Sequence, residues 1–295
     1  MEKNKLSGNF LKLVRPHHYV KNLFVFLPLL FAGKITEAAM LIDAGLAFLS
    51  FCLISSSVYI FNDIMDREED RVHPENRTRP IASGAIRVSR AWLLDLLFTA
   101  GALIIAYVSS MDLFLVILGY KLLNILYSLF LKRIPIFDVM ILALGFVLRL
   151  YAGSVSTGVP LTEWIIIMTF LLSMLLGLGK RRNDVLFMEK EGVVLRSSVR
   201  HYNSDYLNYG MIILSSVIIV AYIMYTLDPE TVARFGNNDL FVTAFWVVAG
   251  ILRYLQLLFV EKRTENPVLL FIRDHPLKII VLAWILNFLF FIYIS

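Results

Sequence analysis

The chain has 295 residues, of which 58% are hydrophobic and 17% are charged, and its formal net charge is +5. A globular core of this length cannot bury so large an apolar inventory, so the composition excludes an ordinary water-soluble protein and indicates one surrounded by lipid. The positive charge does not indicate nucleic-acid binding, because the Lys and Arg residues lie at the ends of apolar segments, near anionic lipid headgroups. Oligomeric state is not predicted by these features.

Nine apolar segments predict transmembrane helices, since crossing the hydrocarbon core takes roughly 20 mostly apolar residues. They lie at residues 20–36, 41–61, 89–108, 111–130, 135–154, 162–179, 208–227, 239–259 and 276–294. The predicted fold class is therefore all-α: a polytopic membrane bundle of nine helices, in a single domain over residues 1–295.

The distribution of Lys and Arg predicts the orientation of this bundle, because positively charged loops are retained on the cytoplasmic side. Most of the 28 basic residues precede the first segment or follow the second, fourth, sixth and eighth, whereas the opposite loops hold only Lys34 and Arg234. We therefore expect a cytoplasmic N-terminus. Two long charged loops, about 62–88 and 180–207, are expected to carry the chemistry at the cytoplasmic face.

The strongest chemical signal is the run FNDIMDREEDR directly after the second apolar segment. If the helix continues for two turns, four oxygen-bearing side chains crowd one of its faces: Asn62, Asp63, Asp66 and Asp70. Carboxylates placed this way repel one another unless a cation lies between them, and hard oxygen ligands suit Mg²⁺. The alternative is a solvated acidic helix end that neighbouring arginines balance.

The sequence HPENRTRPIASG follows this run, and its Pro and Gly residues set turns. Arg77 and Arg79 in this stretch are expected to face the ligand of the metal cluster.

Two further cations, Arg149 and Lys121, lie inside predicted spans, where a charge is a functional candidate. We expect them to line a cavity or to pair with Asp138 or Asp112.

The pattern N-D-x-x-D-x-x-x-D, followed by H-P and R-P-I-A-S-G, resembles the first signature of the UbiA superfamily of intramembrane prenyltransferases. The nine segments, and Tyr127-Ser128 with Lys132-Arg133 after the fourth, extend the resemblance over most of the chain. It implies a bundle around a central cavity that opens to lipid and to the cytoplasmic face of a cell inner (plasma) membrane. Two cytoplasmic loops would cap a Mg²⁺-diphosphate site.

The sixth segment departs from the usual members, which carry a further pair of carboxylates in the second loop. Here three cations, in GKRRND, precede one acid. Cations bind phosphate oxygens directly, so the site suits more phosphate charge than one diphosphate. With RPHHYVKN at 15–22 and RHY at 200–202, this resembles the decaprenyl-phosphate phosphoribosyltransferase branch, which joins phosphoribosyl from phosphoribosyl diphosphate to a polyprenyl phosphate.

The resemblance implies that Asp63 and Asp66 are catalytic and bind Mg²⁺, with Asn62 and Asp70 in support. The expected substrate contacts are Lys21, Arg77, Arg79, Tyr127, Lys132, Lys180, Arg181, Arg182 and Asp184. Lys21 also fits the positive-inside bias, and Tyr127 also fits an aromatic belt.

Two other functions remain open at this point. One is transfer of a polyprenyl group from its diphosphate to an aromatic acceptor, as in quinone biosynthesis, although the missing carboxylate pair argues against it. The other is a transporter or scaffold, which leaves the spacing of the acidic residues unexplained.

Overall fold

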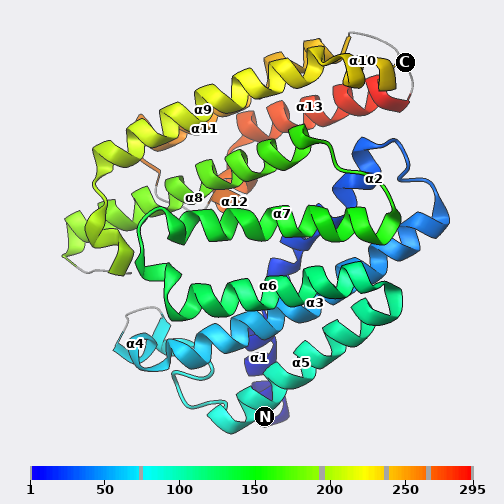
Figure 1. The fold of residues 1–295 in the computed structure, drawn as a ribbon. Helices are drawn as coiled ribbons and strands as arrows, with labels where there is room; N and C mark the ends of the chain where they lie inside the picture. Colours follow the sequence, from blue (N-terminus) through cyan, green and yellow to red (C-terminus); the bar gives the residue numbers. More distant parts are fainter. Residues whose placement is uncertain (1, 73–75, 193–196, 236–238, 264–266, 294–295) are drawn as a thin grey trace. The chain divides into compact units, whose positions relative to one another are not determined.

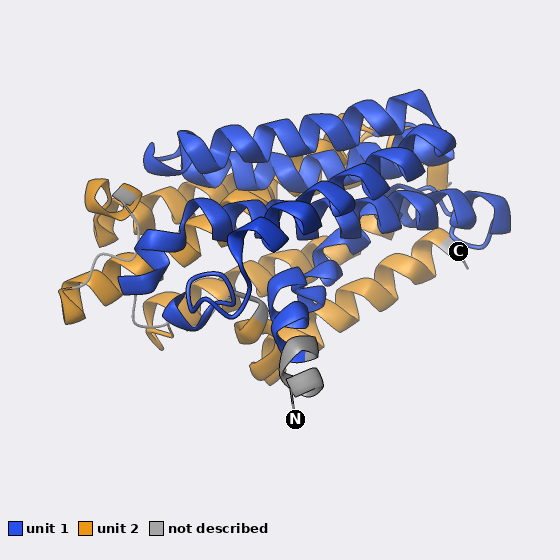
Figure 2. Ribbon diagram, turned by 90° about the horizontal axis from the view of Figure 1, so that it is seen from below, with its two compact units in different colours: residues 1–161 blue, residues 162–295 orange. Residues whose placement is uncertain are grey.

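Helices form all the regular structure of the residues that the computed structural model describes, which are 2–72, 76–192, 197–235, 239–263 and 267–293. The predicted H-P pair at 73–74 and part of the second predicted loop lie outside these residues. The chain divides into two compact units, residues 1–161 and 162–295, which Figure 2 colours separately. Each unit is described by itself.

Unit 1 is organised around its longest helix, α3, which packs against α5, α6, α7 and the 3₁₀ segment η1 (Figure 1). Its core includes Phe51 and Ile54 of α3 with Ala102 of α5 and Ile117 of α6, all fully buried. The elements are α1 (Glu2–Val14), η1 (Pro16–Phe26), α2 (Leu27–Phe31), α3 (Ala38–Met65), α4 (Arg67–Val72), η2 (Asn76–Thr78), α5 (Val88–Ser109), α6 (Met111–Leu129), η3 (Leu131–Arg133) and α7 (Phe137–Thr157).

Unit 2 is built on two helix pairs, α8 with α9 and α11 with α13, and α9 also contacts α11. Its elements are α8 (Glu163–Glu191), η4 (Ser197–His201), α9 (Ser204–Leu227), α10 (Pro229–Phe235), η5 (Asp239–Thr243), α11 (Ala244–Phe259), α12 (Pro267–Arg273) and α13 (His275–Tyr293).

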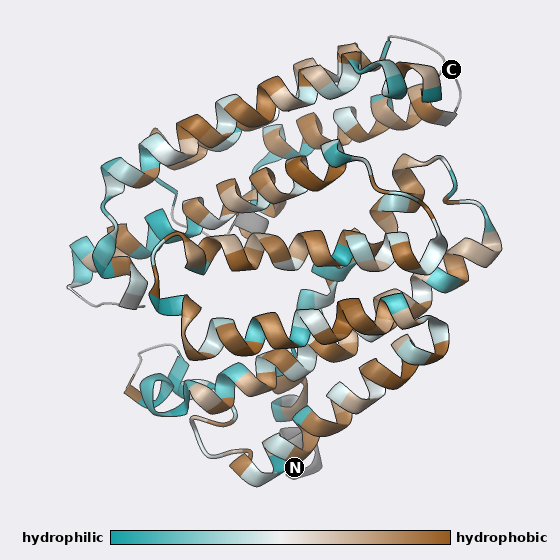
Figure 3. Ribbon diagram, in the orientation of Figure 1, coloured by the Kyte–Doolittle hydropathy of each residue, from teal (hydrophilic) through white to brown (hydrophobic). Residues whose placement is uncertain are grey.

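Eight helical stretches of the described residues are long and apolar enough to cross a membrane. Only 11% to 50% of each apolar stretch is buried inside the protein, so lipid must cover the rest. Figure 3 shows hydrophobic residues along the long helices and hydrophilic residues concentrated near α4 and other helix ends. The predicted all-α, multi-pass membrane protein is confirmed.

The first predicted span, 20–36, is the one that differs in form. The structure has η1 there, continuing directly into α2. A 3₁₀ helix rises about 2.0 Å per residue and an α-helix 1.5 Å, so the 11 residues of η1 and five of α2 extend over roughly 30 Å, a hydrocarbon thickness. The segment therefore has the length of a span with fewer residues than an α-helix needs.

A glycine of α7 allows η1 to lie against this helix. A Cβ atom at Gly153 would lie 1.9 Å from the carbonyl oxygen of Val25 and 3.2 Å from Pro28 Cγ. The backbone of η1 thus touches the backbone of α7, and any larger residue at 153 would force the two segments apart.

Arg149 of α7 fixes η1 from within the bundle. It is 4% exposed, its Nε donates to Asn22 Oδ1 at 2.8 Å, and its Nη2 donates to the Tyr120 hydroxyl at 3.1 Å. Its Nη1 donates to the Gly145 carbonyl at 2.6 Å. The expected pairing of Arg149 with an aspartate is therefore wrong: neutral oxygens and aromatic rings surround this cation.

Lys121 of α6 has a carboxylate partner, but from α5 rather than from Asp112 or Asp138. Its Nζ lies 2.7 Å from Asp95 Oδ1, and both residues are buried. Ser57 of α3 donates to the same carboxylate at 2.6 Å, so one polar cluster joins three helices. Such pairing lowers the cost of placing either charge inside a membrane bundle.

Candidate active site

The four predicted metal ligands lie where α3 ends and α4 begins. Asp66 separates the two helices, with φ −88° and ψ 4°. The backbone hydrogen bonds nevertheless continue through the break, from Asp66 N to Asn62 O at 2.9 Å and from Asp70 N to Asp66 O at 2.8 Å. The helix thus continues nearly as expected, with one distorted residue in its middle.

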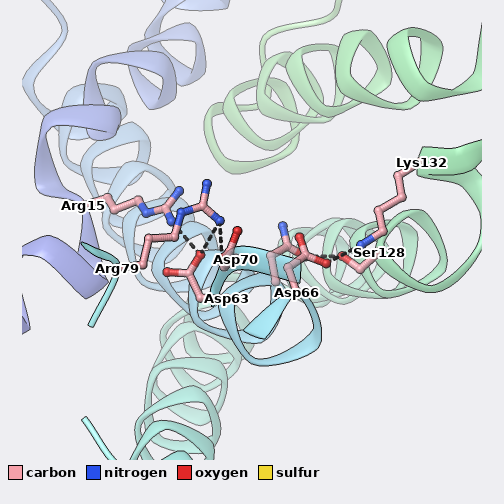
Figure 4. A network of polar contacts seen from close by, with 8 residues as sticks. Arg15, Asp63, Asp66, Asp70, Arg79, Ser128 and Lys132 are labelled. Atoms are coloured by element: carbon pink, nitrogen blue, oxygen red, sulfur yellow. Dashed lines mark hydrogen bonds and ion pairs between the residues drawn. The ribbon is translucent and has the colours of Figure 1, made fainter. Parts of the chain in front are cut away.

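Asp63 and Asp70 share arginine partners on one side of this helix (Figure 4). Arg15, which follows α1, donates from Nη2 to Asp63 Oδ1 at 2.6 Å. Arg79 Nη1 lies 2.7 Å from Asp70 Oδ2 and 3.3 Å from Asp63 Oδ1. One guanidinium therefore bridges two carboxylates that are seven positions apart in the chain.

Asn62 and Asp66 face the end of α6 instead. Ser128 donates a hydrogen bond to Asn62 Oδ1, and Lys132 Nζ forms an ion pair with Asp66 Oδ1. Figure 4 shows Lys132 and Ser128 beside Asp66, away from Arg15 and Arg79. The expected helical register thus holds through Asp66, and within it the four side chains form two pairs with different partners: Asp63 with Asp70, and Asn62 with Asp66.

Burial and charge act against each other at these carboxylates. Asp63 is 1% and Asp70 4% exposed. Burial raises the pKa of the Asp70 carboxyl above its ordinary value, because desolvation disfavours the charged form, and the neighbouring Arg79 opposes that rise. The arginine contacts are thus what keeps a carboxylate compatible with this buried position.

The oxygen atoms of this network fit a Mg²⁺ ion that has few protein ligands. Asp63 Oδ2 is buried and accepts no hydrogen bond from the described residues. The same part of the chain holds no group of three His, Cys, Asp or Glu side chains around one metal position. Mg²⁺ usually takes one or two carboxylates and completes its shell with water and substrate phosphates. The residues therefore fit an ion that binds together with a phosphorylated substrate.

Three of the predicted substrate contacts of unit 1 take no part in this network. Arg77 is exposed, Lys21 is half-buried on η1, and Tyr127 is buried next to Ser128 in α6. Two residues that were not predicted as site residues do take part, Arg15 and Ser128. Both lie in motifs that carried the family resemblance, RPHHYVKN and Tyr127-Ser128, and that position was the only sequence signal for them.

The cationic cluster of the sixth predicted span belongs to unit 2 and lies inside a helix. The predicted apolar span ends at 179, but α8 continues to Glu191, because Lys, Arg, Leu, Met and Glu are all good helix formers. The predicted loop at 180–207 therefore begins only at Gly192, which ends the helix with φ 69°.

The charged residues of α8 differ in burial and partners. Lys180 is exposed, whereas Arg181 is 1% and Arg182 6% exposed. Arg181 Nη1 lies 3.0 Å from Asp184 Oδ2, one turn along the same helix. Arg182 Nε donates to Asn208 Oδ1 of α9 at 2.6 Å.

Comparison with known proteins places the chain in a family. It matches the UbiA prenyltransferase family over residues 23–266. A decaprenyl-phosphate phosphoribosyltransferase of Mycolicibacterium smegmatis is 31% identical over 293 residues, which cover 96% of this chain and 92% of the relative. A protein of the same name from Corynebacterium glutamicum is 28% identical over 294 residues, which cover 98% and 88%.

The fold has solved counterparts as well. The structure of a UbiA homolog from Archaeoglobus fulgidus bound to GPP and Mg²⁺ aligns with a TM-score of 0.73 at 25% identity, covering 96% of this chain and 99% of that chain. With the family match over most of the chain and relatives similar over nearly its whole length, the protein is a transferase that belongs to the UbiA prenyltransferase family.

Proposed function

We propose that the protein transfers the 5-phosphoribosyl group of phosphoribosyl diphosphate to a polyprenyl phosphate of the decaprenyl type and releases diphosphate. The observation that carries the proposal is the cationic end of α8, where Lys180, Arg181 and Arg182 precede Asp184 in place of a carboxylate pair. Such a segment suits substrates that together carry more phosphate than one prenyl diphosphate. The names of the two bacterial relatives support the same reaction.

Asp63 and Asp66 are the proposed catalytic residues. With Asn62 and Asp70 in support, they would hold a Mg²⁺ ion, which neutralises a diphosphate and makes it a better leaving group. Arg79 contacts Asp63 and Asp70, and Lys132 contacts Asp66, so both cations lie close to where diphosphate oxygens would bind. Lys21, Arg77 and Tyr127 remain proposed substrate contacts.

The reaction needs no general base. An oxygen of the lipid phosphate, already an anion at neutral pH, forms a bond to the anomeric carbon of the ribose. The bond from that carbon to the diphosphate oxygen breaks, and diphosphate leaves with the electron pair. Because no proton must move, positioning and electrostatic stabilisation carry the rate.

The proposed site of action is the cytoplasmic face of a cell inner membrane, with the N-terminus in the cytoplasm. The positive-inside pattern supports this orientation. It depends on η1 and α2 crossing the membrane, because eight crossings would place both termini on one side.

The first experiment is a transfer assay in detergent with Mg²⁺, radiolabelled phosphoribosyl diphosphate and a polyprenyl phosphate. We expect label in the lipid product with the wild-type chain. Asp66→Asn is expected to lose about 100-fold or more in rate, because it removes a carboxylate that would hold the Mg²⁺ ion on the leaving diphosphate. Asp112→Asn, an exposed acid at the start of α6, is the matched control and is expected to retain full activity.

The alternative function gives a different result in the same preparation. If the enzyme moves no phosphoribosyl group but prenylates an aromatic acid from a polyprenyl diphosphate, the proposal is wrong and the chain is a prenyltransferase of the more common kind. Transfer that Asp66→Asn leaves unchanged would show that Asp66 is not a catalytic residue.

A further inference from the structure

The three successive cations of α8 are in different electrostatic situations. Arg181 is neutralised by Asp184 at 3.0 Å, and Lys180 is exposed. Arg182 is 6% exposed and forms no ion pair with a described residue, and the acid that acts on it from a longer distance, Glu189, is exposed to solvent. A buried cation without an anion in contact with it is unfavourable, so Arg182 is the member of the trio best placed to take an anion from a ligand.

Arg182 is held in place although it is not neutralised. Its Nε donates to Asn208 Oδ1 at 2.6 Å, and its guanidinium carbon lies 5.3 Å from the centroid of the Phe259 ring. These contacts fix the plane of the guanidinium. Its Nη1 is buried and has no hydrogen-bond partner among the described residues. The geometry therefore leaves one end of an oriented, charged donor without an acceptor.

A second donor of unit 2 is in the same condition and lies nearby. The Tyr254 hydroxyl, on α11, is buried without a hydrogen-bond partner in the described part of the chain, and it interacts electrostatically with Arg182. A Cβ atom on Gly179 would lie 2.3 Å from this hydroxyl, so the glycine provides the room for it. Gly179 and Arg182 are three positions apart on α8, which places them on the same helix face.

Two unfilled donors on adjoining helices, one of them a guanidinium, form an arrangement that suits an anionic oxygen. We propose that Arg182 and Tyr254 bind a phosphate monoester group, with Arg181 and Asp184 acting as a structural pair beside them. The inference deepens the proposed function and rests on it for the source of the phosphate, which is either the 5-phosphate of phosphoribosyl diphosphate or the headgroup of the polyprenyl phosphate. Tyr254 is a substrate-binding residue of this site, and Asn208 and Gly179 are its positioning residues.

The test uses the full chain in detergent and three variants. Tyr254→Phe removes only the hydroxyl, Arg182→Gln removes the charge, and Tyr209→Phe is the matched control on a side chain that is 66% exposed. Each protein is measured for binding of radiolabelled phosphoribosyl diphosphate, of polyprenyl phosphate and of inorganic phosphate. Its melting temperature without ligand is recorded as well.

We expect Tyr254→Phe to weaken binding of one substrate about tenfold, the effect of losing one hydrogen bond to a charged group. It should melt no lower than the wild type, because its hydroxyl has no protein partner to lose. Arg182→Gln should weaken binding of the same substrate further, and Tyr209→Phe should bind both normally. The substrate that the two variants bind more weakly is the one that supplies the phosphate group.

Unchanged affinity of Tyr254→Phe and Arg182→Gln for both substrates would overturn the inference, as would a lower melting temperature of Tyr254→Phe with unchanged affinity. Failure of the proposed function is a separate result, seen as absence of phosphoribosyl transfer by the wild type. In that case the melting temperatures with inorganic phosphate test the anion site. The site is supported if phosphate raises the melting temperature of the wild type and of Tyr209→Phe but not that of Tyr254→Phe or Arg182→Gln. Equal stabilisation of all four proteins, or of none, refutes the site.

Discussion

At the scale of single residues, the spacing of acids in the sequence predicted neighbours along one helix but not their partners. Asn62, Asp63, Asp66 and Asp70 are close because they follow one another on helical turns. Arg79 is only nine positions from Asp70, but the other two cations come from far away in the chain: Arg15 is 48 positions from Asp63, and Lys132 is 66 positions from Asp66. Local periodicity contains no information on such pairs, since they depend on how α1 and α6 pack against α3.

Lys121 offers a test of buried charge. Lys121→Met leaves the Asp95 carboxylate buried without its cation, so we expect the free energy of unfolding to fall by about 3–5 kcal/mol. Unfolding by denaturant in detergent measures the change. The double variant Lys121→Met with Asp95→Asn removes both charges and should recover much of the loss. A single variant as stable as the wild type would show that the buried Asp95 side chain does not require the Lys121 cation.

Asp274 offers a test of pH dependence. A hydrogen bond from Arg253 at 2.6 Å lowers the pKa of the Asp274 carboxyl below its ordinary value. The carboxylate thus contributes stability that is present above the unfolded pKa, near 3.9, and is lost as pH falls through the lower folded value. We expect the contribution of Asp274 to the melting temperature to be constant from about pH 7 to 5 and to decline below about pH 4.

The matched variant is Asp274→Asn, which keeps an oxygen to accept the hydrogen bond from Leu277 N at the start of α13. It should melt lower than the wild type at neutral pH, and the two proteins should converge in acid. If the melting temperatures of the wild type and Asp274→Asn differ by the same amount at every pH, the acid sensitivity comes from other groups.

At the scale of elements, hydropathy located helices well and their ends less well. The apolar pattern ended at residue 179, whereas α8 continues to Glu191 through charged residues of high helix propensity. Membrane hydropathy reports where lipid surrounds a helix, and a helix that leaves the membrane can continue in water. For this reason the predicted second loop was too long, and its cations were expected in a loop rather than on a helix.

The contact between η1 and α7 gives a prediction at this scale. Gly153→Ala places a methyl group 1.9 Å from the Val25 carbonyl oxygen, so the two segments must separate. We expect a loss of about 3 kcal/mol in unfolding free energy. Gly119→Ala, in α6 with no atom within 4 Å of the added carbon, is the control and should be neutral or slightly stabilising. If Gly153→Ala and Gly119→Ala have the same free energy of unfolding, the contact between η1 and α7 tolerates a methyl group and the prediction is wrong.

At the scale of the whole molecule, composition and apolar runs were sufficient to predict an all-α membrane protein, and eight spans were predicted at the right places. The first was predicted as an ordinary helix. Neither Pro16 nor Pro28 alone indicates a 3₁₀ segment, because that form depends on the contacts of η1 with α3 and α7. The family was also predicted correctly, since its first motif lies in eleven consecutive residues whose spacing does not depend on tertiary structure.

The ion pairs at the end of α3 have a consequence for how reactants arrive. Asp63, Asp66 and Asp70 are matched by Arg15, Arg79 and Lys132, so as a unit the resting network is electrically neutral. A bare acidic cluster would attract free cations from solution and repel phosphorylated molecules. A neutral network would do neither, so a metal ion would gain little by entering alone, and under the proposed function Arg15, Arg79 and Lys132 would exchange partners as the anionic substrate and its metal bind together.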